Sequence, residues 1–344
     1  MLYDLLVIGD EREGIGRAIA AAQLGRRVAV ISDPDTAPSL KLLNQAVENL
    51  TGNWRVTAKE QDPSLARRAG VITARSAKLR VSTMLAFRTE VEQLWRRQNS
   101  TDHSLMDSLA IDRISGNAQL VSERSVRIIG GCHPQVVSAT EIVIACGTKS
   151  QQPVSFHCDG QRVFVVESLL ELTSVPRSTI VVGAGETGFA AAILLARLGS
   201  EVTVIDDHFS LFEICRMFGD SFDVIQKLHI AFRLGEEEAI GVEQRFENQK
   251  IVRLASGREM AAEVILACVG REGRTDGMNL ESAGVGFDER NRVWCDGYGK
   301  TWSPRIVAVG SVVGFTGVAE RLSVLRNSES NPVAWASARA TQHL

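Results

Sequence analysis

Residues 178–207 read STIVVGAGETGFAAAILLARLGSEVTVIDD, and the fold can be worked out from this stretch. Its opening run is rich in β-branched residues and predicts a buried strand that stops at Gly183. An alanine- and leucine-rich run with helical spacing covers residues 189–198, and residues 202–205 predict a second strand that Asp206 closes. Strand, glycine-rich turn, helix and strand in this order are typical of a βαβ unit.

The turn of this unit has the spacing of a dinucleotide-binding motif. Gly183 would make the tight turn, Gly185 would let the backbone approach a diphosphate, and Gly188 would let the helix lie close to the strand. The diphosphate would lie at the helix N-terminus, where Glu186 opens the helix, and Asp206 would accept hydrogen bonds from ribose hydroxyls. The prediction is a dinucleotide site; the alternative is a glycine-rich turn that serves packing alone.

The acidic residues at the end of the second strand bear on which nucleotide binds. Asp206 is followed by Asp207, and no arginine lies next to them in the sequence. Two carboxylates would repel a 2′-phosphate, so this pattern favours NAD(H) over NADP(H).

The same pattern occurs a second time near the N-terminus. In residues 4–33, DLLVIGDEREGIGRAIAAAQLGRRVAVISD, Gly9 and Gly14 stand where the later copy has Gly183 and Gly188. The chain therefore carries two βαβ units of the dinucleotide-binding type.

Comparison of the two copies indicates that the first one is damaged. Glu11 stands where the later copy has Gly185, and Ser32 stands where it has Asp206. A carboxylate at position 11 would fill the space of a diphosphate and repel it, at a cost on the order of 1 kcal/mol or more. We expect the first unit to keep the fold of a nucleotide site and to lose much of its chemistry.

Composition bounds the class of protein. The 344 residues are 44% hydrophobic and 23% charged, with a net charge of −3, as in an ordinary globular protein. The absence of a basic block argues against a nucleic-acid partner, and no apolar run is long enough to span a membrane. The six cysteines form no CxxC pair, which suits a reducing cytoplasm and predicts neither a redox disulfide nor a metal site. The N-terminus is too short and too acidic for a signal peptide.

Other segments give a coarser prediction. Helices are expected at 40–50 and 79–97, a polar loop at 99–105, and an antiparallel ribbon over 111–147 that returns to a buried strand ending at Gly147. After Asp206 the sequence predicts a helix over 212–228 and a helix from residue 318. The strands expected there are at 230–233, 241–245, 251–254, 264–270 and 305–310.

Taken together, these motifs resemble the FAD-dependent pyridine nucleotide–disulfide oxidoreductases, and within them the soluble pyridine nucleotide transhydrogenases. The motifs that carry the resemblance are Val7-Ile8-Gly9, residues 142–147 (IVIACG), 181–185 (VVGAG), 270–276 (GREGRTD) and 307–310 (VAVG).

The resemblance implies an α/β fold with two Rossmann-like dinucleotide-binding domains, the second inserted in the first. The FAD-type domain would comprise residues 1–150 and 271–325, the NAD-binding domain residues 151–270, and the tail residues 326–344. It also implies hydride transfer between nicotinamide nucleotides through FAD. The cofactor-binding residues implied in addition to those of the later motif are Gly9, Gly14, Cys146, Gly147, Gly270, Gly310 and Ser311.

Several positions depart from the family pattern. Ser311 stands where the family has an aspartate, Leu40 stands where it has a lysine beside the flavin, and Ala190 replaces the glutamate partner of that lysine. The resemblance does not extend to a C-terminal dimerisation domain, so the oligomeric state stays open.

Two functions therefore remain. One is an oxidoreductase that passes hydride between nicotinamide nucleotides through FAD; the other is an NAD(H)-binding pseudoenzyme or redox-sensing regulatory protein without flavin. No residue is predicted as a catalytic acid, base or nucleophile, because the six histidines form no recognisable relay. Cys146 would lie near a flavin diphosphate if one binds, and otherwise is a buried structural thiol.

Overall fold

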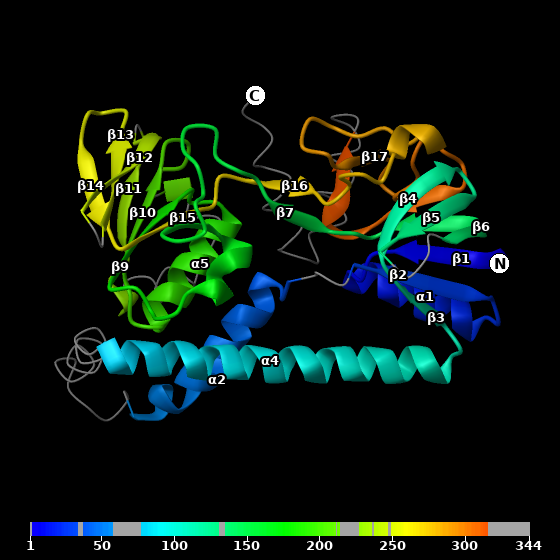
Figure 1. Ribbon diagram of the computed structural model, residues 1–344, viewed down its shortest axis with the longest axis horizontal. Helices are drawn as coiled ribbons and strands as arrows, with labels where there is room; N and C mark the ends of the chain where they lie inside the picture. Colours follow the sequence, from blue (N-terminus) through cyan, green and yellow to red (C-terminus); the bar gives the residue numbers. More distant parts are fainter. Residues whose placement is uncertain are drawn as a thin grey trace. The chain divides into compact units, whose positions relative to one another are not determined.

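The computed structural model describes residues 2–33, 37–57, 77–130, 135–210, 212–213, 227–235, 237–246 and 249–315. Its contacts divide the chain into two compact units. Unit 1 comprises residues 1–36, 98–149 and 271–344, and unit 2 comprises residues 37–97 and 150–270. Each unit is built on a sheet whose central strands are parallel, with helices against it (Figure 1), so the predicted α/β fold with two Rossmann-like units is confirmed.

The sheet of unit 1 has seven strands, in the order β3-β2-β1-β6-β5-β4, with β18 paired to β6. Strands β3, β2, β1, β6 and β18 are parallel to their neighbours, whereas β4 and β5 form an antiparallel ribbon on β6. The strands are β1 (Leu2–Ile8), β2 (Val28–Ser32), β3 (Asp112–Ser115), β4 (Asn117–Ser122), β5 (Ser125–Ile129), β6 (Gln135–Ile144) and β18 (Ile306–Ala308).

The predicted ribbon is confirmed except at its beginning. The segment 112–115 pairs in parallel with β2 at the edge of the sheet and does not belong to the ribbon. Gly116, with φ of +147°, separates it from β4. A single glycine thus redirects the chain, which the alternating pattern of the segments did not reveal.

Both faces of the unit 1 sheet are buried. Side chains alternate along β1, so that Leu5 and Val7 pack with α1 (Arg12–Gln23) and Leu6 and Ile8 pack with the antiparallel ribbon. Strands covered on both faces read as continuous apolar runs, as β1 does.

The sheet of unit 2 is parallel throughout, in the order β11-β10-β9-β15-β8. Helix α5 (Glu186–Arg197), helix α2 (Leu40–Thr57) and part of α4 (Ala77–Ser108) cover one face, and the antiparallel sheet β12-β13-β14 covers the other (Figure 1). The strands are β8 (Val163–Val165), β9 (Ser178–Val182), β10 (Glu201–Asp206), β11 (Ala231–Leu234), β12 (Ala239–Phe246), β13 (Gln249–Leu254), β14 (Glu259–Ala262) and β15 (Val264–Ala267).

Residues 37–97 group with unit 2, whereas the sequence places them in the first domain. The reason is packing: Leu43, Val47 and Phe87 belong to the same core cluster as Leu194 of α5. The local sequence of residues 37–97 does not predict these long-range contacts.

Helix α4 differs from its prediction at the C-terminal end. The expected loop over 99–105 is wrong, because the helix continues from Ala77 through to Ser108. Residues 98–108 contain no glycine or proline, and buried Met106 anchors this part in the core of unit 1. Polar residues alone therefore do not end a helix.

The remaining predicted strands are confirmed, as β11, β12, β13 and β18 within two residues and as β15, which ends at Ala267, three residues before the expected end. Strands β8 and β14 were not predicted. Most of the helix expected over 212–228, and the helix expected from residue 318, lie outside the described residues. Short elements complete the fold: β7 (Thr148–Ser150), η1 (Val166–Glu171), β16 (Arg271–Gly273), η3 (Leu280–Ala283), β17 (Val293–Cys295), η4 (Gly310–Val312) and β19 (Val313–Phe315).

Within the described part of the chain, no helix has both the length and the apolar character needed to cross a bilayer.

Candidate dinucleotide sites

Each unit has the same turn between its first strand and the helix that follows. The Gly9 N–H donates to the carbonyl of Ile31 at 2.8 Å in unit 1. The Gly183 N–H donates to the carbonyl of Ile205 at the same distance in unit 2. Gly9 and Gly183 both have φ of +104°, a value that glycine adopts without strain. The internal repeat is therefore a repeat in three dimensions.

Close packing accounts for the second pair of matched glycines. A Cβ on Gly14 would overlap the side chain of Ala145, and a Cβ on Gly188 would overlap the carbonyl oxygen of Gly183. Both helices thus lie against their sheets with no room for a side chain, as the spacing predicts.

Gly185 is different, because packing does not require it. Its φ is −63°, an ordinary value, and a Cβ at this position would meet no described atom within 4 Å. Any small residue would fit here as far as the fold is concerned. A glycine at this position would let a ligand approach the backbone closely. The alternative, a glycine-rich turn that serves packing alone, does not explain Gly185.

The N-terminus of α5 starts at this open position. Gly185 is the N-cap, and no side chain among the described residues caps it. Its carbonyl accepts the N–H of Phe189 at 2.9 Å, and Glu186 lies in the first turn. The first N–H groups of a helix and its dipole attract an anion, so a phosphate fits this place.

Asp206 lies at the carboxyl end of β10 and holds two loops together. Its Oδ2 accepts the N–H of Ala184 at 2.6 Å, and its Oδ1 accepts the N–H groups of His208 at 2.7 Å and Phe209 at 2.8 Å. Each carboxylate oxygen has two lone pairs, so acceptance from a ribose hydroxyl is compatible with these bonds. Asp206 therefore shapes the glycine turn directly.

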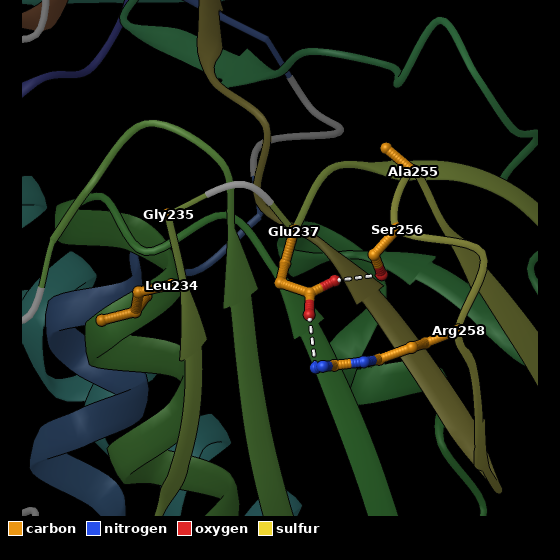
Figure 2. A pocket seen from close by; sticks show the side chains of 6 residues that line it. All are labelled: Leu234, Gly235, Glu237, Ala255, Ser256 and Arg258. Carbon is orange, nitrogen blue, oxygen red and sulfur yellow. Dashed lines mark hydrogen bonds and ion pairs between the residues drawn. The ribbon is translucent and has the colours of Figure 1, made fainter.

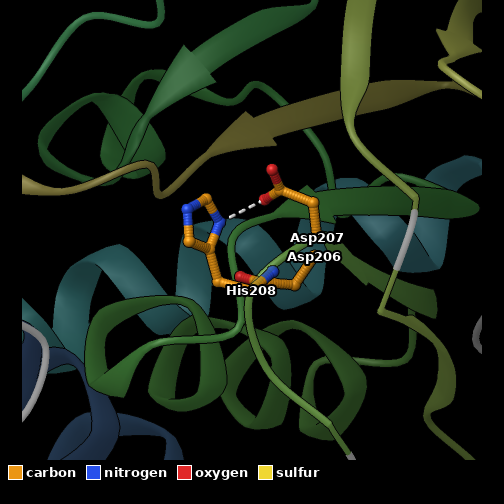
Figure 3. A group of neighbouring side chains, drawn as sticks. All are labelled: Asp206, Asp207 and His208. Carbon is orange, nitrogen blue, oxygen red and sulfur yellow. Dashed lines mark hydrogen bonds and ion pairs between the residues drawn. The ribbon is translucent and has the colours of Figure 1, made fainter. Parts of the chain in front are cut away.

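The neighbours of Asp206 form an exposed pair (Figure 3). The Asp207 carboxylate lies 2.5 Å from Nδ1 of His208, and this hydrogen bond raises the pKa of the imidazole. Asp206, Asp207 and His208 lie close enough together to resemble a metal site. The backbone bonds of Asp206 already account for the position of its carboxylate.

A hollow of about 630 Å³ opens at the adjacent strand, and sequence reasoning missed it. Leu234 pairs with Asp206 in the parallel ladder, so the hollow lies beside the strand that Asp206 ends. Glu237 accepts from Ser256 at 2.9 Å and from Arg258 at 3.0 Å (Figure 2). The lining residues are Leu234, Gly235, Glu237, Ala255, Ser256 and Arg258, and only the Gly and Ser turn residues signal it in the sequence.

Gly270, another predicted site residue, follows β15. Its φ is +141°, its carbonyl accepts the N–H of Gln151 at 2.9 Å, and a Cβ there would lie 2.8 Å from the Gln151 amide oxygen. The contacts of Gly270 explain why a glycine is needed there without a ligand. Arg271 donates to the carbonyl of Thr148 at 2.7 Å, and this bond fixes its side chain.

In unit 1 the position equivalent to Gly185 holds Glu11, the N-cap of α1. Its Oε2 accepts the backbone N–H of Ser311 at 2.8 Å, and its Oε1 accepts the Ser311 hydroxyl at 2.5 Å. A Cβ on Gly310 would overlap this carboxylate, and a Cβ on Gly147 would lie 3.0 Å from it. The structure thus brings together Glu11, Gly147, Gly310 and Ser311 around one carboxylate.

The surroundings of Glu11 change the pKa of its carboxyl group. Burial raises the pKa of the Glu11 carboxyl, its hydrogen bonds to Ser311 oppose the rise, and the charges of Glu13 and Asp10 add to it. Three acidic side chains at one helix N-terminus are poor neighbours for a diphosphate.

These residues do not fit the diphosphate of FAD. The space at the N-terminus of α1 holds a carboxylate of the chain itself, and a hollow of about 70 Å³ lies beside it. That hollow is lined in part by Gly9, Asp33, Cys146 and Arg274.

Cys146 follows β6 and lies near Glu11. Burial raises its pKa to about 12, and the charge of Glu11 is the next cause.

The chain belongs to the pyridine nucleotide–disulphide oxidoreductase family, whose model matches residues 3–338. The two matched turns described above have the strand–glycine turn–helix geometry that is typical of Rossmann folds. The family binds FAD and NAD(P), so the predicted resemblance is confirmed at this level.

Two curated relatives illustrate the similarity. The soluble pyridine nucleotide transhydrogenase of Mycobacterium bovis (strain BCG / Pasteur 1173P2) is 30% identical over 334 residues, covering 92% of this chain and 67% of that protein. The soluble pyridine nucleotide transhydrogenase of Pseudomonas putida (strain GB-1) is 28% identical over 339 residues, covering 92% and 68%.

Two solved structures share the fold. The HOCl-induced flavoprotein disulfide reductase RclA of Escherichia coli has a TM-score of 0.70 at 19% identity, covering 96% of this chain and 71% of that one. LpdA of Mycobacterium tuberculosis has a TM-score of 0.72 at 19% identity, covering 92% and 69%.

Proposed function

We propose that the chain binds NAD(H) at the β9–α5 turn of unit 2. One observation carries this proposal: Gly185 is a glycine that neither packing nor backbone conformation requires, and it leaves the N-terminus of α5 open. The diphosphate would lie against Gly185 and the first N–H groups of α5, and Gly183 and Gly188 would shape the turn around it. When bound, the nucleotide supplies a hydride at its nicotinamide ring.

The adenosine half would lie toward the end of β10. Asp206 would accept from the ribose hydroxyls, and the hollow lined by Leu234 and Arg258 lies beside that strand. Asp206 and Asp207 would repel a 2′-phosphate, so NAD(H) is the expected ligand and NADP(H) binds more weakly.

We further propose that unit 1 does not hold FAD, so that the chain is a catalytically degenerate, NAD(H)-binding member of its family. The Glu11 carboxylate, which accepts both donors of Ser311, supports this part. Such a protein would act as a redox-sensing or regulatory partner, and the lack of a CxxC pair suits a cytoplasmic location.

A second candidate is hydride transfer between nicotinamide nucleotides through FAD. The 30% identity to proteins named soluble pyridine nucleotide transhydrogenase, over 92% of the chain, favours it. The visible spectrum of the purified protein decides between the two. Flavin bands that NADH bleaches would overturn the degenerate assignment, and a colourless protein that FAD does not reconstitute would support it.

The NAD(H) site is tested with a matched pair of substitutions. Gly185→Glu would place a carboxylate at the diphosphate position, as in unit 1, and should weaken NADH binding by about tenfold or more. Gly241→Glu is the control, because a Cβ at Gly241 in β12 also meets no described atom within 4 Å and the residue lies outside the turn. Titration of NADH fluorescence measures both, and equal affinities would refute the site.

A further inference from the structure

The Glu11 carboxylate has the surroundings of a bound anion. Two donors of Ser311, the backbone N–H at 2.8 Å and the hydroxyl at 2.5 Å, bind its two oxygens separately. Glu11 is also the N-cap of the twelve-residue helix α1, although its carboxylate makes no capping hydrogen bond to the first N–H groups of that helix. In unit 2 the equivalent place beside Gly185 is open.

We propose that Glu11 serves as the built-in anion of unit 1. Its carboxylate takes the place that a dinucleotide diphosphate takes in a turn of this kind, so unit 1 folds without FAD and excludes it. The proposal rests on the proposed function only in using the β9–α5 turn of unit 2 as the reference for an open site.

The residues around Glu11 are consistent with this role. Ser311 presents two donors and no charge toward the carboxylate, whereas an acidic side chain at that position would repel it. Gly310 leaves the space that the carboxylate fills, since a Cβ there would overlap it. Ser311 therefore supplies donors to a carboxylate in the turn, and Gly310 leaves room for it.

An internal anion also competes well against an external one. Glu11 is covalently fixed next to its donors, so it loses little freedom on binding them, whereas a free nucleotide loses translational and rotational freedom. A diphosphate would have to displace Glu11 and then lie beside Asp10 and Glu13, whose carboxylates would repel it.

The test counts ADP sites per chain by isothermal titration calorimetry, because ADP carries the diphosphate and can report on both turns. The wild-type chain should bind one ADP, which NADH displaces, and G185E should bind none. E11G should bind a second ADP that NADH does not displace, and the double variant E11G/G185E should retain only that site.

Three further variants show whether the filled space or the negative charge keeps ADP out of unit 1. E11Q keeps the shape of the side chain and should not gain a site, because the space stays filled. Glu13→Gln removes a neighbouring carboxylate of the same helix turn and should also leave the count unchanged. E11A replaces E11G if the latter fails to fold by circular dichroism, with the same expected gain.

The outcomes distinguish this inference from the proposed function. If E11G and E11A fold and bind no more ADP than the wild type, or if E11Q gains a site, the inference is wrong, and the NADH site of unit 2 is unaffected. If the wild-type chain binds no ADP that NADH displaces, the proposed function fails. A gain of one site in E11G would still support the inference in that case.

Discussion

In unit 2 the turn between β9 and α5 faces open space at Gly185, whereas in unit 1 the equivalent turn faces the carboxylate of Glu11. The two turns share the hydrogen bond from their first glycine to the second strand and the left-handed conformation of that glycine. The comparison separates two kinds of glycine in one motif. The glycines that the backbone and packing require are present in both copies, and the glycine that neither of them requires is present in one.

The largest expected effects fall on the packing glycines. Gly188→Ala should destabilise the fold by about 3 kcal/mol or more, because its Cβ would overlap the backbone oxygen of Gly183. Gly14→Ala meets the side chain of Ala145 instead, so A145G should restore part of the stability that G14A loses. Urea denaturation measures the free energy of unfolding of the single and double variants. A double variant no more stable than G14A would show that the contact with Ala145 is not the cause of the loss.

A smaller effect is expected at the ends of the second strands, β10 and β2. Asp206→Ala removes the acceptor of three backbone N–H groups and should cost about 1–3 kcal/mol. Ser32→Ala, the matched change in unit 1, should stay within about 0.5 kcal/mol. Thermal unfolding compares the two, and equal losses would mean that Asp206 does not organise its turn.

The smallest effect is a pH dependence at Glu11. Its pKa in the folded chain is raised above the ordinary value of 4.5, so folding favours the protonated carboxyl. The contribution of the Glu11 carboxyl to the free energy of unfolding is fully present below the ordinary pKa. It is lost as pH rises through the raised pKa of the folded chain. The stability of the wild type relative to E11Q should therefore fall as pH rises from about 4.5, as melting curves at a series of pH values will show. A relative stability that rises over this range would contradict the raised pKa.

The sequence predicts the two βαβ units well because their signals are local. Strand, turn and helix follow one another within residues 4–33 and 178–207, and the matched glycines Gly9 and Gly183 mark the same backbone geometry. The damage at Glu11 could be predicted because an intact copy of the motif lies in the same chain.

The parts that could not be predicted depend on residues far apart. Glu11 finds its donors on Ser311, which lies 300 positions away. The hollow of unit 2 is lined by residues from two separate loops, near Gly235 and Ser256, and no local pattern connects them. Helix α4 continues through polar residues because buried Met106 anchors its end, a contact that the local pattern does not contain.

The order of the chain has a consequence for its synthesis. Unit 2 ends at residue 270, whereas the unit 1 sheet is completed only by β18, which pairs with β6 through Ile306–Ala308. When the nascent chain has left the ribosome as far as residue 270, every segment of unit 2 has been synthesised. At that stage residues 142–144 of β6 do not yet have β18 to pair with. Open strand edges are where chains aggregate. The late segment 306–311 thus both pairs with this edge of β6 and brings Ser311 to Glu11.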